Sequence, residues 1–346
     1  MNELEIFLEI SGYAGSRFDL VQAGGGNSSV KLSDGTMYIK SSGIYLSEVT
    51  ENSGFCIVNN KKILEIFDNK KIFEEEDKIK RNKIVQDYIS QYNLTKNNKP
   101  SIETLMHSLL KKYTLHTHPI VVNIITCRKN WKEVLSNLFG ENVIFINYNP
   151  PGIELALEIK KHIKNKQFQI IFLQNHGLVV TSDNKEDIRN LTEFVLNKIE
   201  TYLQIDMSKY KITEEISKFY DNKYNVYLSE DILLNKMISS PFISSLPFCP
   251  DKIVYCGVKV LKLGQNPKKD IQKYINEYSD IPKVIIYKEH LFFVAKNIKN
   301  AKAMESVLKF HVLSLSFNSN QDINYLQNNE IKYIINMEEE KYRNYI

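Results

Sequence analysis

The stretch Tyr113-Thr114-Leu115-His116-Thr117-His118-Pro119 carries two histidines, separated by one residue, at the end of a segment that predicts a β-strand. Side chains two positions apart on a strand point to the same face, so both imidazoles can reach one ion. Zinc binds imidazole nitrogen at about 2.0–2.1 Å, and a catalytic zinc site has three protein ligands and one open position. For this stretch by itself, a structural or solvated histidine pair is the alternative.

A third histidine, His176, follows in the tripeptide Asn175-His176-Gly177. Two predicted strands, Gln169 to Leu173 and Leu178 to Thr181, flank it, so His176 stands where a strand ends and a turn begins. The sequence therefore predicts a metal site with His176 as the third ligand. The other histidines are isolated, and we expect none of them to bind metal: His107, His162, His290 and His311.

Two donor-rich segments predict an anion site. Gly24-Gly25-Gly26-Asn27-Ser28-Ser29 precedes a predicted hairpin, Val30 to Lys40, which turns at Asp34-Gly35, and Ser41-Ser42-Gly43 follows it. Glycine lets backbone N–H groups approach an anion, Asn and Ser add donors, and Lys40 adds a cation. We expect a phosphate cradle built from Gly26, Asn27, Ser28, Lys40, Ser42 and Gly43. A flexible connector and an ordinary turn would have the same composition.

A lone glutamate, Glu103, falls in the first turn of a helix that Pro100-Ser101-Ile102-Glu103 opens, with Ser101 as the expected N-cap. The helix dipole accounts for a carboxylate at such a position. Spacing by itself therefore assigns no chemistry to Glu103.

The length of 346 residues predicts one main domain and one smaller one. Strands and helices mix without strict βαβ alternation, which indicates a layered α/β fold with a partly antiparallel sheet. A polar segment, Ser208 to Lys223, marks the expected break, so we expect domains over residues 1–212 and 229–346. Predicted elements also include helices Glu3 to Leu20, Lys78 to Gln91, Lys185 to Asp206, Ile271 to Tyr278 and Ala301 to Ser314, and strands Val143 to Tyr148, Lys252 to Tyr255, Val284 to Tyr287 and Leu291 to Ala295.

Charge and cysteine content narrow the class of protein. The chain has 45 Lys and Arg residues and 41 Asp and Glu residues, which gives a net charge of +4. This near balance does not indicate binding to nucleic acid or to an anionic membrane. No apolar run reaches the roughly 20 residues that span a bilayer. The four cysteines form no CxxC pair and the N-terminus does not read as a secretion signal, so we expect reduced thiols in a cytoplasmic protein.

Five motifs in order, GGGNSSVK, IKSSG, PSIETLMH, HTHP and NHGL, resemble those of the class II aldolase/adducin family over about Gly12 to Leu203. The set looks closest to the branch that forms the aldolase half of bifunctional rhamnulose-1-phosphate aldolase/lactaldehyde dehydrogenase proteins. The resemblance implies a layered class II aldolase-like domain with a central, mostly antiparallel sheet flanked by helices, plus a smaller C-terminal α/β unit to which we assign no role.

The resemblance also implies the parts of the site. It implies Zn²⁺, or another divalent metal, on His116, His118 and His176, and Glu103 as the acid/base residue. The implied phosphate site uses Asn27, Ser42, Gly43 and Ser101, and Ile102 stands where related chains often have a second serine. The implied partners are a small sugar phosphate and further copies of the chain, in a homo-oligomer such as a tetramer. Related enzymes use a tyrosine as a further acid, which the 20 tyrosines here leave unassigned.

The implied reaction is reversible aldol cleavage of a phosphorylated ketose through a metal-stabilised enediolate, catalysed by an aldehyde lyase. The same site would serve a sugar-phosphate 4-epimerase or a dehydratase. Alternatives of other classes are a non-catalytic scaffold like adducin and a structural zinc site closed by a fourth ligand. No GxGxxG follows residue 250, so the hydride step of the dehydrogenase half is not expected.

Overall fold

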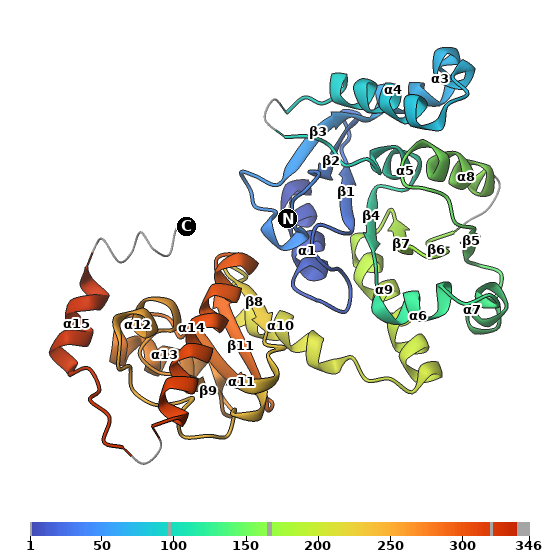
Figure 1. The fold of residues 1–346 in the computed structure, drawn as a ribbon. Coiled ribbons are helices and arrows are strands. Elements are labelled where there is room, and N and C mark those ends of the chain that lie inside the picture. The colour runs from blue at the N-terminus through green and yellow to red at the C-terminus, as the bar shows by residue number, and fades with distance from the viewer. Residues whose placement is uncertain (1, 96–97, 165–167, 319–320, 338–346) are drawn as a thin grey trace. The chain divides into compact units, whose positions relative to one another are not determined.

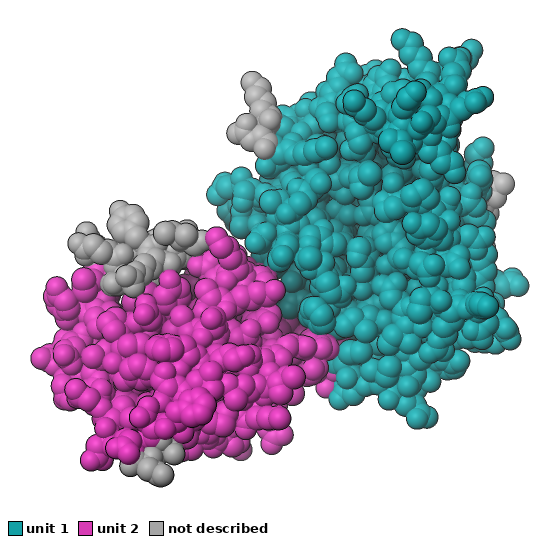
Figure 2. All heavy atoms as spheres, in the orientation of Figure 1, with its two compact units in different colours: residues 1–207 teal, residues 208–346 magenta. Residues whose placement is uncertain are grey.

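The computed structural model describes residues 2–95, 98–164, 168–318 and 321–337, which fold into two compact units (Figures 1 and 2). The first unit is Met1–Met207 and the second is Ser208–Ile346. The expected break at Ser208 to Lys223 is instead largely a helix, α10 (Ser208–Phe219), so the boundary precedes this segment. Among its charges, Tyr210, Ile212 and Ile216 are buried at helical spacing, which gives the segment an apolar face to pack.

The described residues of the first unit form a seven-stranded sheet, and its mostly antiparallel character confirms the predicted fold class. Its strands are β1 (Asn27–Lys31), β2 (Thr36–Lys40), β3 (Phe55–Asn59), β4 (Tyr113–Thr117), β5 (Ile144–Ile146), β6 (Ile170–Leu173) and β7 (Gly177–Ser182). The spatial order is β3-β2-β1-β4-β7-β6-β5, and only the β5–β6 pair is parallel among these neighbours. The strand that carries His116 therefore lies in the middle of the sheet.

Helices cover both faces of this sheet (Figure 1). They are α1 (Glu3–Gly15), α2 (Asn60–Glu65), α3 (Lys70–Glu74), α4 (Lys78–Gln91), α5 (Thr104–Leu109), α6 (Ile120–Thr126), α7 (Trp131–Phe139), α8 (Ile153–Ile163) and α9 (Lys185–Leu203), with 3₁₀ turns η1 (Leu46–Glu48) and η2 (Ile66–Asp68). Helices α1, α6, α7 and α9 share one core with Leu178 and Val180 of β7. Val179, between these two residues, packs with α5 and α8 on the other face, as strand alternation requires.

The β1–β2 hairpin forms as predicted, but its first strand begins earlier than expected. Asn27, Ser28 and Ser29 were expected in a loop, whereas the structure pairs them with β4, Asn27 lying opposite His116. Helix α1 also ends at Gly15 rather than at Leu20, and the Gly15 Cα packs directly against the backbone of Ser47. Residues 16–26 consequently form an irregular segment between α1 and β1.

The second unit contains a four-stranded sheet of order β8-β11-β10-β9 in the described residues. Its elements after α10 are β8 (Asn225–Leu228), α11 (Ile232–Lys236), α12 (Pro250–Cys256), β9 (Leu261–Lys262), α13 (Pro267–Tyr278), β10 (Val284–Tyr287), β11 (His290–Ala295), α14 (Ile298–Ser316) and α15 (Asn328–Asn336). The expected strand Lys252 to Tyr255 is wrong, since this stretch is part of α12. Pro250 occupies the start of that helix, where its missing N–H costs nothing, and Lys252 donates to the carbonyl of Gly257 at the other end.

No helix within the described ranges is both long enough and apolar enough to cross a membrane.

Candidate metal centre

His116 lies on β4 with its side chain on the sheet face that α5 covers, because Tyr113 and Leu115 point into the core of the opposite face. Its Nδ1 is 3.0 Å from the carbonyl oxygen of Leu178 on β7. A carbonyl only accepts, so Nδ1 carries the proton and Nε2 presents a lone pair. Strand pairing thus sets both the tautomer and the direction of the candidate metal-binding nitrogen.

Three imidazole nitrogens converge at this point. Nε2 of His116 lies 3.1 Å from Nε2 of His118 and 3.3 Å from Nε2 of His176. Ligands placed tetrahedrally at about 2.0–2.1 Å from zinc stand about 3.3–3.4 Å apart, so these separations suit one shared ion. Among the described residues these three histidines are the group whose ligand atoms are close enough to hold a metal together.

The ring of His118 is held by backbone rather than by a hydrogen-bond acceptor. The backbone N–H of His118 donates to the carbonyl of Leu20 at 2.9 Å. A Cβ on Gly25 would lie 2.8 Å from Nδ1 of His118, and one on Gly177 would lie 3.1 Å from its Cδ2. The imidazole therefore occupies a slot between Gly25 and Gly177. A residue with a side chain at either position would close this slot.

His176 stands in the three-residue turn between β6 and β7. The preceding Asn175 adopts φ +53°, a left-handed conformation that asparagine tolerates better than most residues. Nδ2 of Asn123 on α6 donates to the carbonyl of His176 at 3.2 Å, and the Asn175 N–H donates to the carbonyl of Thr126 at 3.4 Å. Helix α6 therefore anchors the turn that presents the third nitrogen.

Glu103, the residue just before α5, places a buried carboxylate beside the three histidines. Its Oε1 lies 3.5 Å from Nε2 of His116 and 3.4 Å from Nε2 of His176, and it has no hydrogen-bond partner among the described residues. Its Oε2 accepts a hydrogen bond of 2.5 Å from Nδ2 of Asn27. An unpartnered buried oxygen is costly, so Oε1 is available to interact with a bound group.

Burial governs the protonation of these groups. Desolvation raises the pKa of Glu103 to about 7, while the hydrogen bond from Asn27 and the charge of Lys40 act in the opposite direction. Desolvation also lowers the pKa of His176 to about 4, with a smaller contribution from His118. The pKa of His116 and that of His118 are lowered for the same main reason. The imidazoles are therefore neutral at neutral pH, as metal ligands must be.

Lys40 is buried, and its ammonium group is fully occupied by backbone. Nζ donates to the carbonyl oxygens of Gly24, Ser41 and Ile44 at 3.0, 3.4 and 2.6 Å. An ammonium has three protons, so Lys40 ties the segment before β1 to the turn after β2 and has no donor left for a direct phosphate contact. Its positive charge remains beside the site. Burial lowers the pKa of Lys40 to about 8, while the charge of Glu103 acts in the opposite direction.

The other predicted phosphate residues divide into two groups. Ser42 and Gly43 form an exposed turn, and the Ser42 N–H donates to the carbonyl of Lys99 at 2.8 Å, which sets this turn beside Ser101. Ser101 is buried, and its Oγ accepts a hydrogen bond from the Glu103 N–H at 3.2 Å. The N-cap of α5 is Glu103 rather than Ser101, the residue that the sequence predicted.

Ser28 and Gly26 fall in the second group, away from that turn. Ser28 points to the opposite sheet face, where its Oγ is 2.6 Å from Oγ of Ser11 on α1, so the structure does not bring its hydroxyl to the site. Gly26, with φ +72°, packs against the carbonyl of His116, where any Cβ would collide.

Several residues that shape the centre carry no signal in the sequence. Asn123, Leu178 and Leu20 act through single contacts with the histidines, two of them through backbone carbonyls. Asn27 was expected at phosphate and instead contacts Glu103. Only the glycine content of GGGNSSVK and NHGL could have pointed to close packing near a ligand.

Fold and site together define an α/β protein with a candidate divalent-metal centre. Residues 11–203 match the family described as Class II Aldolase and Adducin N-terminal domain, and the chain belongs to this family.

Individual relatives resemble part of the chain. The uncharacterized oxidoreductase YuxG of Bacillus subtilis (strain 168) is 25% identical over 217 residues, which cover 58% of this chain and 30% of that protein, so the chain spans less than a third of this relative. The N-terminal class II aldolase domain of a conserved protein from Thermoplasma acidophilum is 24% identical with a TM-score of 0.50, covering 58% of this chain and 94% of that chain. A sugar-phosphate aldolase from Thermotoga maritima is 17% identical with a TM-score of 0.43, covering 58% and 94%. The Thermoplasma likeness shows the fold.

Proposed function

We propose that this chain is a divalent-metal-dependent aldehyde lyase, with zinc as the metal, that cleaves a phosphorylated ketose reversibly by an aldol reaction. The observation that carries the proposal is the unpartnered Oε1 of Glu103, which faces Nε2 of His116 and Nε2 of His176 at 3.5 and 3.4 Å. Three neutral imidazoles beside one buried carboxylate supply both a metal site and a proton-transfer group. Membership of the class II aldolase and adducin family supports an enzyme of this kind.

The donor set fits a catalytic metal better than a structural one. Three imidazole nitrogens suit zinc, and the described residues offer no fourth His or Cys ligand atom within the same cluster. When bound, the ion acts as a Lewis acid that polarises substrate oxygen and stabilises the negative charge that develops there. The chain's own contribution is to hold His116, His118 and His176 at the spacing that such an ion requires.

Glu103 moves the proton in this proposal. Cleavage of the carbon–carbon bond leaves a carbon on the ketone half that must take up a proton, and synthesis must remove it again. A carboxyl group with a pKa near 7 can do both at neutral pH, because neither protonation state is strongly favoured. Its Oε2 stays bound to Asn27, so the free Oε1 is the oxygen that carries the proton to and from substrate.

Substrate binding at the remote end rests on the exposed turn at Ser42 and Gly43, with buried Ser101 next to it. The turn presents the hydroxyl of Ser42, whose backbone N–H is already bound to the carbonyl of Lys99, and the charge of Lys40 lies behind it. A phosphate held here would fix the reacting end near Glu103, which converts binding energy into orientation. Ile102, which is 40% exposed, contributes no donor to this end.

Further parts of the proposal concern the whole protein. We place the chain nearest the aldolase half of the rhamnulose-1-phosphate aldolase/lactaldehyde dehydrogenase branch, working in the cytoplasm as a homo-oligomer. The name of the Bacillus subtilis relative refers to an oxidoreductase, and the aligned region covers 30% of that protein. We therefore propose the lyase step, rather than a redox step, for the residues described here.

The test is metal analysis of the purified protein followed by a panel of phosphorylated ketoses. We expect one bound divalent metal per chain and release of an aldehyde, detected by a coupled reductase, with the isosteric Glu103→Gln variant as the control that keeps metal and loses turnover. Interconversion of two ketose phosphates without free aldehyde would identify an epimerase. A protein without metal and without turnover would overturn the proposal and favour a scaffold.

A further inference from the structure

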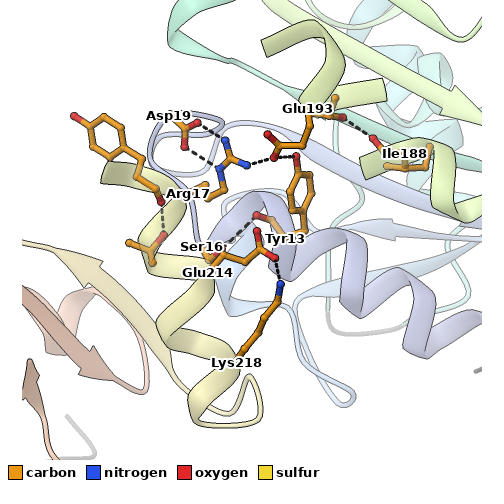
Figure 3. Close-up of polar contacts among 11 residues, drawn as sticks. Tyr13, Ser16, Arg17, Asp19, Ile188, Glu193, Glu214 and Lys218 are labelled. Atoms are coloured by element: carbon orange, nitrogen blue, oxygen red, sulfur yellow. Dashed lines mark hydrogen bonds and ion pairs between the residues drawn. The ribbon is translucent and has the colours of Figure 1, made fainter. Parts of the chain in front are cut away.

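A buried ion-pair network lies at the end of α1, outside the residues that face the metal site (Figure 3). Nε and Nη2 of Arg17 donate to the two carboxylate oxygens of Asp19 at 3.0 and 2.5 Å. Nη1 of Arg17 donates to Oε1 of Glu193 on α9, which also accepts from the hydroxyl of Tyr13 at 2.7 Å. Arg17 is 1% exposed and Asp19 2%, so the fork between them is shielded from water.

Stability alone is a weak reason for such a pair. Removing two charges from water is costly, and apolar residues of similar volume often serve a core as well or better. What a bidentate arginine–carboxylate pair adds is geometry, since it defines the position and the plane of the carboxylate.

Asp19 belongs to the irregular segment 16–26, and this segment contacts the candidate metal ligand His118. The carbonyl of Asp19 accepts from the Ile120 N–H at 3.0 Å, and the carbonyl of Leu20 accepts from the His118 N–H at 2.9 Å. Five residues further on, the Cα of Gly25 lies against the His118 ring, close enough that a Cβ would stand 2.8 Å from Nδ1. The segment therefore touches His118 at both its backbone and its ring.

His118 depends on packing by this segment more than His116 does. Nδ1 of His116 is directed by the carbonyl of Leu178, whereas Nδ1 of His118 makes no hydrogen bond within the described part of the chain. Metal-bound imidazoles are normally oriented by a hydrogen bond to their second nitrogen. For His118, packing by the segment replaces that bond.

We propose that Arg17 and Asp19 are positioning residues for the metal ligand His118, acting through the segment Asp19–Gly25. Neither residue touches the metal or the substrate. Arg17 fixes the Asp19 carboxylate, Asp19 and Leu20 fix the backbone of the residues that follow β4, and Gly25 fixes the ring. The inference rests on the proposed function in one respect only, namely that the three histidines bind a divalent metal.

The experiment measures zinc affinity of metal-free full-length protein by competition with a chromophoric chelator. The variants are Arg17→Met, which keeps the length of the side chain, and Asp19→Asn, which keeps its shape. We expect both to weaken zinc binding about 10–100-fold, the usual effect of losing a group that orients a ligand. Arg17→Lys, which cannot form the fork, should fall between wild type and Arg17→Met.

A matched control comes from another ion pair in the same unit. Nη2 of Arg81 and Oε1 of Glu154 are 2.7 Å apart, with side chains 15% and 16% exposed. Arg81→Met should lower the melting temperature without changing zinc affinity. The absorption spectrum of the cobalt-loaded protein gives a second readout, because the band positions report ligand geometry, which a loss of stability alone does not move.

The outcomes separate a positioning role of Arg17 and Asp19 from a purely structural one. Unchanged zinc affinity and cobalt spectrum in folded Asp19→Asn would overturn the inference, as would an equal loss of affinity in Arg81→Met. If Arg17→Met does not fold, the isosteric Asp19→Asn variant still decides. A wild-type protein that binds no divalent metal would instead overturn the proposed function, and with it any role in positioning a ligand.

Discussion

Nδ2 of Asn27 donates a hydrogen bond of 2.5 Å to Oε2 of Glu103, and it does so from the strand position directly opposite His116. Asn27 was expected to bind phosphate, yet its amide is committed to the candidate acid/base residue. The contact leaves Oε1 of Glu103 as the oxygen that faces the histidines. Asn27 therefore links the strand that carries His116 to the proposed proton-transfer group.

Asn27→Ala should lower kcat about 10–100-fold with little change in KM, because the lost contact orients Glu103 and not the bound phosphate. Steady-state kinetics with the best ketose phosphate from the panel, at full metal content, measure this. If instead KM rises at constant kcat, Asn27 binds the substrate and the role given to it here is wrong.

Glu103→Gln should retain zinc and lose about 10²–10⁴-fold in turnover, since the amide is isosteric but cannot exchange a proton. Metal content by atomic spectroscopy and turnover by the coupled aldehyde assay separate the two effects. Zinc loss in this variant would show that the carboxylate is itself a ligand, and unchanged turnover would remove it from the mechanism.

His116→Ala and His176→Ala should each abolish zinc retention and activity, because two imidazoles do not hold the ion in this geometry. His162→Ala is the control, since this histidine is 46% exposed and, among the described residues, its ion pair is with Glu158 on its own helix. Metal analysis after dialysis is the measurement. Full zinc content in either ligand variant would refute the assigned ligand set.

Gly25→Ala should weaken zinc binding, because its Cβ would lie 2.8 Å from Nδ1 of His118 and the ring must move. Gly24→Ala is the matched control one residue away, where the nearest heavy atoms are 3.9 Å from a Cβ. Chelator competition on both proteins tests the slot between Gly25 and Gly177. Equal affinities for Gly24→Ala and Gly25→Ala would mean that the ring is positioned by something else.

Acid should destabilise the fold partly through His107. This histidine is fully buried, with Nδ1 bound to Oγ of Ser29 at 2.7 Å, and desolvation lowers its pKa to about 3. The unfolded chain takes up this proton near pH 6.5 and the folded chain does not, so the contribution of His107 to stability is constant above that pH and falls below it. At pH 5.5 the loss from this one group is on the order of 1 kcal/mol.

Urea unfolding of metal-free wild type and His107→Gln at pH 7.5 and 5.5 checks this value. The glutamine keeps a partner for Ser29 and cannot titrate, so the variant should lose less stability on acidification than wild type. Identical pH dependence in both proteins would show that His107 is protonated in the folded state or accessible to water.

The local pattern predicted those elements whose signal is strong over a few residues. The β1–β2 hairpin follows from alternating apolar residues around Asp34-Gly35, and α4 has the bounds expected from Lys78 to Gln91. Lys252 to Tyr255 failed because four residues that include Ile253 and Val254 suit a strand by composition. Pro250 at the helix start and packing of α12 against α14 outweigh that preference.

The residues of the candidate metal centre also divide into properties that the sequence predicts and properties that depend on packing. Their chemistry is a property of the side chains, so His116, His118, His176 and Glu103 could be selected from residue type, order and resemblance to a family. Which face each residue occupies depends on strand register: Asn27, paired with His116, turns to Glu103, while its neighbour Ser28 turns to Ser11 on the far face. A loop and a strand start are alike in composition, so only pairing with β4 could separate them.

Residue type and periodicity along the chain determined the kinds of groups present and a layered α/β class with a partly antiparallel sheet. The resemblance of five ordered motifs added the family and the mostly antiparallel character of the sheet. The tertiary structure decided which nitrogen of His116 is free, which oxygen of Glu103 is unpartnered and what holds His118 in its slot. Those properties arise from contacts between residues that are distant in sequence, such as Arg17 and Glu193 or Leu20 and His118. No local pattern encodes such contacts, because backbone carbonyls and glycine Cα atoms look alike at every position until the chain has folded.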